Sequence, residues 1–256
     1  MARAREAIAA CLSELQSETH ENQQKALLTL VSITKSLADM DNILFLNSVI
    51  LSSTSAEPSR IAASLLCSLA MLDKNKAKLG VAGTVEALIK AISRPRGPAS
   101  HHFLSTLAEL VQFHGNCTVA VRAGAVPVLI KLVENSDLAG TSLAILCLLA
   151  RFEEGLTALK ETDQIVPLMM EILKGKCMLS KEGAADILLR LFDESEGCIR
   201  DAQRLPEFSS VLADLSVRGS VRARDKASLL MKKLMEANMD IVCGDTGNRT
   251  ATYLQW

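Results

Sequence analysis

The chain has 256 residues, of which 49% are hydrophobic, 22% charged and 3% aromatic. Its 28 basic and 29 acidic residues give a net charge of −1, which argues against nucleic acid or an anionic membrane as a partner. With so few aromatic side chains, Leu, Ala, Val, Ile and Met must fill the core, and this composition favours packed helices over a β-sandwich. No apolar run reaches the roughly 20 residues of a membrane-spanning helix, so we expect no membrane insertion.

The N-terminal part of the chain is predicted to be helical. We expect residues 1–17 to form a capping helix rather than a targeting peptide, because Glu6 and Glu14 interrupt them and no apolar stretch with a cleavage site follows. Residues 22–37 have the apolar spacing of a long helix, with a companion helix over 43–51. These two open a repeat domain that we place at residues 18–236, with about five repeats.

A short sequence pattern then recurs at nearly constant spacing. It begins at Val85, Val126, Val166 and, in a weaker form, Leu205, which are 41, 40 and 39 residues apart. A second pattern interleaves with it and places two apolar residues three positions apart within a stretch of helical periodicity. These pairs are Leu66 and Leu69, Leu107 and Leu110, Leu146 and Leu149, Leu188 and Leu191, and Met231 and Leu234. A period of about 40 residues indicates stacked helical repeats.

The repeating unit contains a long, a short and a medium helix. Pro127, Pro167 and Pro206 fall near the first turn of the medium helix, where the missing N–H of proline costs nothing. Gly83 and Gly124 come just before that helix, where the chain must reverse sharply. The long helices are expected to begin near Pro58, Ser100, Leu138, Leu179 and Ser220. Three helices in about 40 residues is the armadillo pattern, so the predicted fold is all-α, a right-handed armadillo-repeat α-solenoid or α–α superhelix.

The C-terminal end differs from the repeats. Residues 237–256 show no helical period and contain Gly244 and Gly247. We therefore expect a flexible tail after the last repeat.

Three stretches of the repeat domain resemble a known family. Residues 75–80 read Asn-Lys-Ala-Lys-Leu-Gly and are followed by Gly-Thr-Val-Glu-Ala-Leu, and residues 121–132 repeat this pattern around Ala-Gly-Ala-Val-Pro. Residues 221–230 contain Arg-Ala-Arg-Asp-Lys-Ala. Together these stretches resemble the armadillo region of plant U-box ubiquitin ligases. The resemblance implies a protein-binding adaptor in plant ubiquitination, defence or receptor-kinase signalling, whose partner is a receptor-like kinase or a ubiquitination substrate.

The sequence also departs from that family. The opening motif of a U-box and its Thr-Tyr-Glu-Arg helix do not occur in this chain. The chain is then either an adaptor or the substrate-recognition region of a U-box ligase whose catalytic segment is absent from this sequence. A scaffold in a cytoskeletal or transport assembly is a third hypothesis, because fold does not fix function. None of these hypotheses makes the chain itself an enzyme.

The long helices of a solenoid line one concave surface, which is where we expect a partner to bind. Stepping by four residues beside the apolar pairs gives one row of groove-facing side chains for each helix. The rows are Arg60, Ser64 and Ser68; His101, Ser105 and Glu109; Gly140, Ala144, Leu148 and Phe152; Glu182, Asp186 and Arg190; and Asp225, Leu229 and Lys233. The middle row is apolar and its neighbours are charged, as in many binding patches. The alternative is that Leu148 and Phe152 pack against the next repeat, since a register error of one residue would exchange the two faces.

The rows argue against one kind of partner. Armadillo-type nuclear import adaptors resemble one another in a ladder of Trp and Asn that holds basic signal peptides. The matched positions of this chain carry neither residue type. We therefore do not expect a receptor for nuclear localisation signals.

No motif for a metal, a cofactor or a catalytic site stands out. His101 and His102 are adjacent, and neighbouring residues on a helix point about 100° apart, so the pair cannot chelate one ion. Phosphate-binding loops and hydrolase motifs are missing. The seven cysteines are scattered without a C-x-x-C pair, which indicates a reducing compartment, the cytoplasm or also the nucleus.

Overall fold

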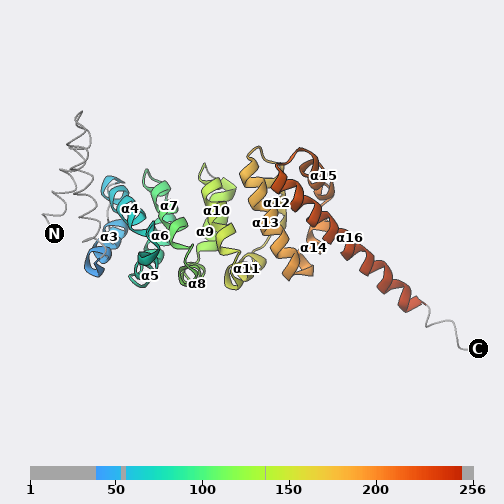
Figure 1. The fold of residues 1–256 in the computed structure, drawn as a ribbon, viewed down its shortest axis with the longest axis horizontal. Coiled ribbons are helices and arrows are strands. Elements are labelled where there is room, and N and C mark those ends of the chain that lie inside the picture. The colour runs from blue at the N-terminus through green and yellow to red at the C-terminus, as the bar shows by residue number, and fades with distance from the viewer. Residues whose placement is uncertain (1–38, 53–55, 136, 250–256) are drawn as a thin grey trace, which may run out of the picture. The chain divides into compact units, whose positions relative to one another are not determined.

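The computed structural model describes residues 39–52, 56–135 and 137–249, and in these ranges all fourteen regular elements are α-helices (Figure 1). Contacts divide the chain into two compact units that meet between Ala123 and Gly124, and each unit is described by itself. Within the described ranges, no single helix is long and apolar enough to cross a membrane. Only α8 and α9 taken together pass that test of length and composition.

The N-terminal unit contains two long helices with their companions. Its helices are α3 (Met40–Ser52), α4 (Ala56–Ala70), α5 (Asp73–Val81), α6 (Thr84–Ile92), α7 (Ser100–Leu110) and α8 (His114–Arg122). The long helices α4 and α7 pack side by side, while α3 packs against α4 and α6 (Figure 1). Each short helix, α5 or α8, follows the end of a long helix after a two- or three-residue turn.

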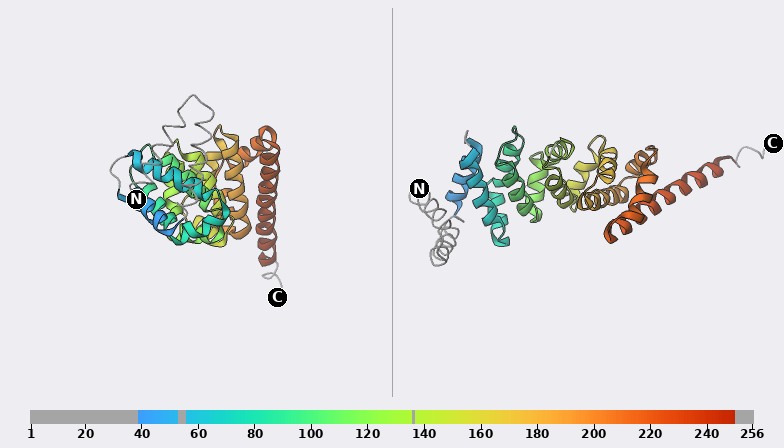
Figure 2. Two further views of the ribbon diagram at one scale, coloured as in Figure 1. Left: turned by 60° about the vertical axis from the view of Figure 1, so that its left-hand side comes forward. Right: turned by 90° about the horizontal axis from the view of Figure 1, so that it is seen from above.

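The C-terminal unit repeats this arrangement. Its helices are α9 (Ala125–Asn135), α10 (Ala139–Leu149), α11 (Glu153–Lys160), α12 (Ile165–Lys174), α13 (Met178–Glu194), α14 (Glu196–Gln203), α15 (Phe208–Arg218) and α16 (Val221–Arg249). The long helix α13 packs against both α10 and α16. Figure 2 shows α16 as one continuous helix that extends beyond the helices it packs against.

The sequence pattern and the helices agree closely. All five predicted starts of long helices lie within two residues of the observed ones. The paired leucines that predicted these helices are buried, with 0–1% exposure from Leu66 through Leu191 and 7% for Leu234 in the last helix. The all-α repeat fold is therefore confirmed, and its core is the apolar stripe of each helix pressed between neighbouring helices.

Three expectations turn out differently or remain outside the description. Pro206 lies two residues before α15 rather than in its first turn. Residues 237–249, expected in a tail without helical structure, continue α16, because extending an existing helix by one residue is far easier than starting a new one. The predicted capping helix over 1–17, the helix over 22–37 and residues 250–256 of the tail lie outside the described residues.

The turns before the medium helices α6, α9 and α12 use a left-handed backbone. Gly83 and Gly124 have φ of +77° and +81°, and the equivalent residue one repeat later is Gln164, with φ of +59°. An added Cβ at either glycine would meet no atom within 4 Å, so only the backbone conformation disfavours a side chain there. Gln164 therefore holds a conformation that costs an L-residue about 1–2 kcal/mol.

Neighbouring repeats of the N-terminal unit are tied by a buried amide. Asn116, 2% exposed, donates through Nδ2 to the carbonyl oxygens of Leu110 and Lys76, both at 2.9 Å. Lys76 belongs to the preceding repeat. Gly80, four residues after Lys76, has no side chain and leaves the space that the Asn116 amide fills. A Cβ on Gly80 would lie 1.9 Å from Asn116 Oδ1. Asn75 makes the equivalent bond within its own repeat, to Leu69 at 3.0 Å.

The first prediction concerns the left-handed turn. Gly124→Ala should lower the free energy of unfolding by about 1 kcal/mol, and Gln164→Gly should raise it by up to about 1 kcal/mol, because only glycine accepts positive φ freely. The control is Gly140→Ala, in helix α10 with no atom within 4 Å of the new Cβ, which should not destabilise the protein. Urea unfolding of the three variants measures these values. A Gly124→Ala variant as stable as wild type would contradict the assigned turn.

The second prediction concerns the buried amide. Asn116→Asp should destabilise the protein by about 2–4 kcal/mol at neutral pH, because a carboxylate would face two carbonyl oxygens. The loss should shrink as acid protonates the new carboxyl group, which can then donate one hydrogen bond. Asn238→Asp is the control: this residue is exposed and only accepts, from Gln203 Nε2 at 2.9 Å. Equal losses for both variants would show that Asn116 does not join the repeats.

Candidate protein-binding site

Besides Gly140, which has no side chain, the proposed rows contain fifteen residues, and all of them reach the surface. Ser68, His101, Ala144, Asp225 and Leu229 are exposed, and the other ten are partly exposed. The apolar pairs beside them are buried except for the partly exposed Met231, so the helical register assumed for the rows agrees with the observed burial. Whether a partner touches these rows stays a prediction.

In the N-terminal unit, Glu109 belongs to an internal polar cluster. The ammonium of Lys76, whose side chain is 5% exposed, lies 2.8 Å from the Asp73 carboxylate and 3.8 Å from that of Glu109. It also donates to Gln112 Oε1 at 3.0 Å. Burial of an ammonium requires such partners. Glu109 therefore helps to hold Lys76 between repeats, in addition to any role in the proposed row.

The C-terminal unit has a hollow of about 580 Å³ between α10 and α13, which we call the α10–α13 hollow. It brings together four of the proposed residues, Ala144 and Leu148 from α10 and Glu182 and Asp186 from α13. The remaining lining residues are Gly140, Leu143, Cys147, Arg151, Cys177, Leu179, Ser180, Gly183 and Lys226. Because Ala144 is exposed and Leu148 only half-buried, the middle row opens to the surface rather than being covered by the next repeat.

Phe152 does not continue that row. Helix α10 ends at Leu149, and Phe152 has the extended backbone of the residue before α11, with φ of −117° and ψ of 146°. The step of four residues fails where the helix stops. Phe152 instead lines a second hollow of about 350 Å³, the α11 hollow, together with Arg190 and Glu194 of α13.

Ion pairs fix most of the charges around the α10–α13 hollow. The Asp186 carboxylate lies 2.9 Å from Lys226 Nζ and 3.1 Å from Arg190 Nε. Lys226 also donates to the backbone carbonyl of Glu182 at 3.2 Å, and the Glu182 carboxylate accepts the hydroxyl of Ser220. Burial raises the pKa of Asp186, but the hydrogen bonds from Lys226 and Arg190 outweigh it and hold that pKa below its usual value.

Two cations of the hollow were missed by the sequence analysis. The last row was placed on Asp225, one residue from Lys226, which is the residue that reaches the hollow. The rotation of α16 about its axis is set by the burial of Ala223, Ala227 and Leu230. Arg151 lies in the turn after α10, where helical spacing gives no signal.

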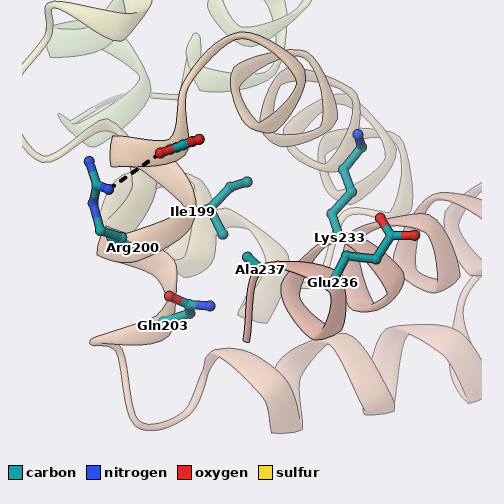
Figure 3. Close-up of a pocket in the computed structure, with 7 residues that line it drawn as sticks. Ile199, Arg200, Gln203, Lys233, Glu236 and Ala237 are labelled. Carbon is teal, nitrogen blue, oxygen red and sulfur yellow. Dashed lines mark hydrogen bonds and ion pairs between the residues drawn. The ribbon is translucent and has the colours of Figure 1, made fainter. Parts of the chain in front are cut away.

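Lys233 is the one proposed groove residue in a third hollow, between α14 and α16, of about 440 Å³. Figure 3 shows Ile199 and Gln203 on α14 directed toward α16, which carries Lys233, Glu236 and Ala237, whereas the Arg200 side chain points away from α16. Lys233 also forms an ion pair with Asp193 of α13. The exposed Asp225 and Leu229 line none of these three hollows, so the fifth row is not brought together with the fourth.

Solved structures similar to this chain share one architecture. A designed armadillo repeat protein superimposes with a TM-score of 0.68 at 15% identity, over 89% of this chain and 99% of the other. The armadillo-repeats-only protein of Plasmodium falciparum gives a TM-score of 0.65 at 14% identity, over 78% of this chain and 95% of the other. By its fold, the chain is an armadillo-repeat protein.

Sequence comparison connects these armadillo repeats to one curated protein. No family model matches the chain. U-box domain-containing protein 1 of Medicago truncatula is 33% identical over 122 residues, which are 44% of this chain and 17% of that protein. The resemblance to the armadillo region of plant U-box proteins is thus confirmed as a partial one, and the match spans less than a fifth of the relative.

A designed armadillo repeat protein in complex with peptide (KR)4 is also similar to the chain. Its TM-score is 0.66 at 16% identity, over 89% of this chain and 99% of the other. At this identity the similarity concerns the armadillo fold alone. Within the residues that the structure describes, no group of three or more His, Cys, Asp or Glu side chains could hold a metal ion.

Two cysteines in the α10–α13 hollow differ in acidity. Burial, followed by the nearby Asp186 carboxylate, raises the pKa of Cys147 to about 11. Cys177 is exposed just before α13, and its pKa is lowered by the hydroxyl of Ser180 and then by backbone N–H groups of the first turn, although it makes no regular capping hydrogen bond. Cys177 therefore lies at the exposed edge of the hollow, and Cys147 lies in its more buried wall.

The third prediction uses this difference. At pH 7.5, iodoacetamide should alkylate Cys177 at least about tenfold faster than Cys147, because the thiolate is the nucleophile and the higher pKa leaves Cys147 almost fully protonated. The Cys147 rate should keep rising up to about pH 11, whereas the Cys177 rate should level off at lower pH. Quantitative mass spectrometry of the two peptides gives both rates. In denaturant the rates should converge, and equal rates in the folded protein would contradict the assigned environments.

Proposed function

We propose that this armadillo-repeat protein is a non-enzymatic binding module, and that the C-terminal unit holds an extended segment of a partner protein along α10, α13 and α16. The observation that carries the proposal is the α10–α13 hollow, where an apolar floor from Ala144 and Leu148 meets a charged rim at Glu182 and Asp186. An apolar centre within a polar rim is the usual anatomy of a protein-binding patch.

The size and character of the hollow support a peptide rather than a buried small molecule. The hollow of about 580 Å³ is open to the surface at the exposed Ala144 and Leu179, whereas a site for a small molecule encloses most of its ligand. The designed armadillo repeat protein in complex with peptide (KR)4 is an example of a peptide held by this fold.

The partner setting follows from the partial similarity to U-box domain-containing protein 1 of Medicago truncatula. We propose an adaptor that binds a ubiquitination substrate or a receptor-like kinase. The second candidate is the substrate-recognition region of a U-box ligase, which the same similarity favours. The full-length transcript distinguishes the two candidates: an in-frame U-box upstream of Met1 supports the ligase, and an in-frame stop codon there supports the adaptor.

The fourth prediction tests peptide binding at the hollow. A phage-displayed library of random 16-residue peptides is selected on the wild-type protein, and the enriched peptides are synthesised. The double variant Ala144→Gln with Leu148→Gln should weaken their binding at least about tenfold, because it removes apolar contact and crowds the hollow. Fluorescence anisotropy gives the dissociation constants, and circular dichroism confirms that each variant is folded.

A matched control separates the hollow from the rest of the unit. Ala213 and Val217 are also an exposed Ala and an apolar residue four positions apart, on α15, away from the hollow. Ala213→Gln with Val217→Gln should leave the dissociation constants within about twofold of wild type. The proposal fails when no peptide is enriched on the wild-type protein, or when the hollow variant binds the peptides as wild type does.

A further inference from the structure

Arg151 carries a charge that the protein does not use internally. Its side chain is exposed and lines both the α10–α13 hollow and the α11 hollow. Within the described part of the chain, the guanidinium makes no hydrogen bond or ion pair. An arginine offers five N–H donors in a planar fork that matches a carboxylate. The donors of Arg151 are therefore open to a ligand between the two hollows.

The other charges of the α10–α13 hollow already have partners. Asp186 is held by Lys226 at 2.9 Å and by Arg190 at 3.1 Å, and Lys226 also donates to the Glu182 carbonyl. The Glu182 carboxylate accepts the Ser220 hydroxyl. A ligand that used any of these groups would first have to break a contact. Arg151 alone among the charged groups of this hollow can bind an opposite charge without such a loss.

The α11 hollow limits where a negative charge can go. Its wall contains the carboxylates of Glu153 and Glu194 as well as the cations Lys160 and Arg190. A ligand carboxylate deep in that hollow would meet two like charges. At Arg151, on the side of the α10–α13 hollow, it would instead lie beside the apolar floor and near Asp186, whose charge two cations already offset.

The apolar part of the site also lacks a cover. Leu179, in the first turn of α13, is 79% exposed at the edge of the hollow, and Ala144 is exposed on the opposite helix. Covering such side chains is worth about 25 cal/mol for each Å² removed from water. An apolar ligand side chain placed between Leu179 and Ala144 would remove their surface from water. The adjacent residue of the ligand could then reach Arg151.

We propose that the partner segment of this site is acidic and apolar: one apolar side chain packs in the α10–α13 hollow between Ala144 and Leu179, and an adjacent Asp or Glu binds Arg151. This inference rests on the proposed function and adds the chemistry of the partner to it. It sets the site apart from an armadillo surface that holds a basic peptide such as (KR)4. The recognition combines one buried apolar contact with one charge-assisted, bidentate hydrogen bond.

The fifth prediction is a double-mutant cycle. The probes are the peptides selected on the wild-type protein, each remade with its Asp changed to Asn or its Glu to Gln. The change should weaken binding to wild type about fivefold, and should weaken binding to Arg151→Gln less than about twofold, because the charge pair is already lost. Arg224→Gln is the control: Arg224 is exposed on α16 and lines none of the three hollows. Changing the peptide's Asp to Asn or its Glu to Gln should weaken binding to Arg224→Gln about fivefold, as it does for wild type.

A parallel selection on the charge-reversed variant tests the same inference without chosen peptides. On wild type, Asp and Glu should be enriched next to Leu, Ile, Met or Phe; on Arg151→Glu, this enrichment should disappear in favour of Lys and Arg. Peptides that bind in the hollow without acidic enrichment, or with equal losses on wild type and Arg151→Gln, overturn the acidic specificity while the proposed function stands. A selection that enriches no peptide overturns both.

Discussion

Each long helix carries a pair of apolar residues three positions apart, two leucines in all but the last helix, that it cannot bury by itself, and the fold follows from this constraint. Leu66 with Leu69, and Leu146 with Leu149, are 0–1% exposed only because the adjacent helices press against them. A helix in the middle of the stack is therefore covered by the helix before it and the helix after it, as α13 is covered by α10 and α16. One face of each long helix is used in this way, and the remaining face is left for solvent or a ligand.

The charges of the α10–α13 hollow come from the turn after α10 and from two neighbouring helices. Helix α10 contains no charged residue, and the first charge after it is Arg151, in the turn. Helices α13 and α16 supply Glu182, Asp186 and Lys226, so the polar rim of the hollow comes from two neighbouring helices and the apolar floor mainly from one. The arrangement separates two tasks: α13 and α16 are held together by their own ion pairs, and α10 contributes an apolar surface with one unpaired cation at its end.

The apolar periodicity of the sequence was enough to predict the helices, but it did not predict every residue that lines the α10–α13 hollow. Apolar pairs located every long helix, because burial of an apolar stripe depends only on spacing along one helix. Spacing also placed Ala144, Leu148, Glu182 and Asp186 on one surface. It failed at Phe152, where α10 had already ended, and at Lys226, where the rotation of the last helix depends on packing. The two ion pairs of Asp186 and the unpaired state of Arg151 depend on contacts between helices, which one helical period does not encode.

The fit of Asn116 over Gly80 has a meaning for how such chains can change. The amide needs a residue without a side chain in the preceding repeat, and it bonds to a carbonyl of that same repeat. By sequence, the positions equivalent to Gly80 and Asn116 one repeat later carry Val121 and Gly155, so this combination of residues does not recur there. A repeat that carries an asparagine like Asn116 could not follow a repeat with valine at the Gly80 position, because a side chain there would overlap the amide. The repeats are similar in sequence, yet the repeat that contains Asn116 accepts only a preceding repeat with room for its amide. The order of the repeats is therefore constrained during evolution.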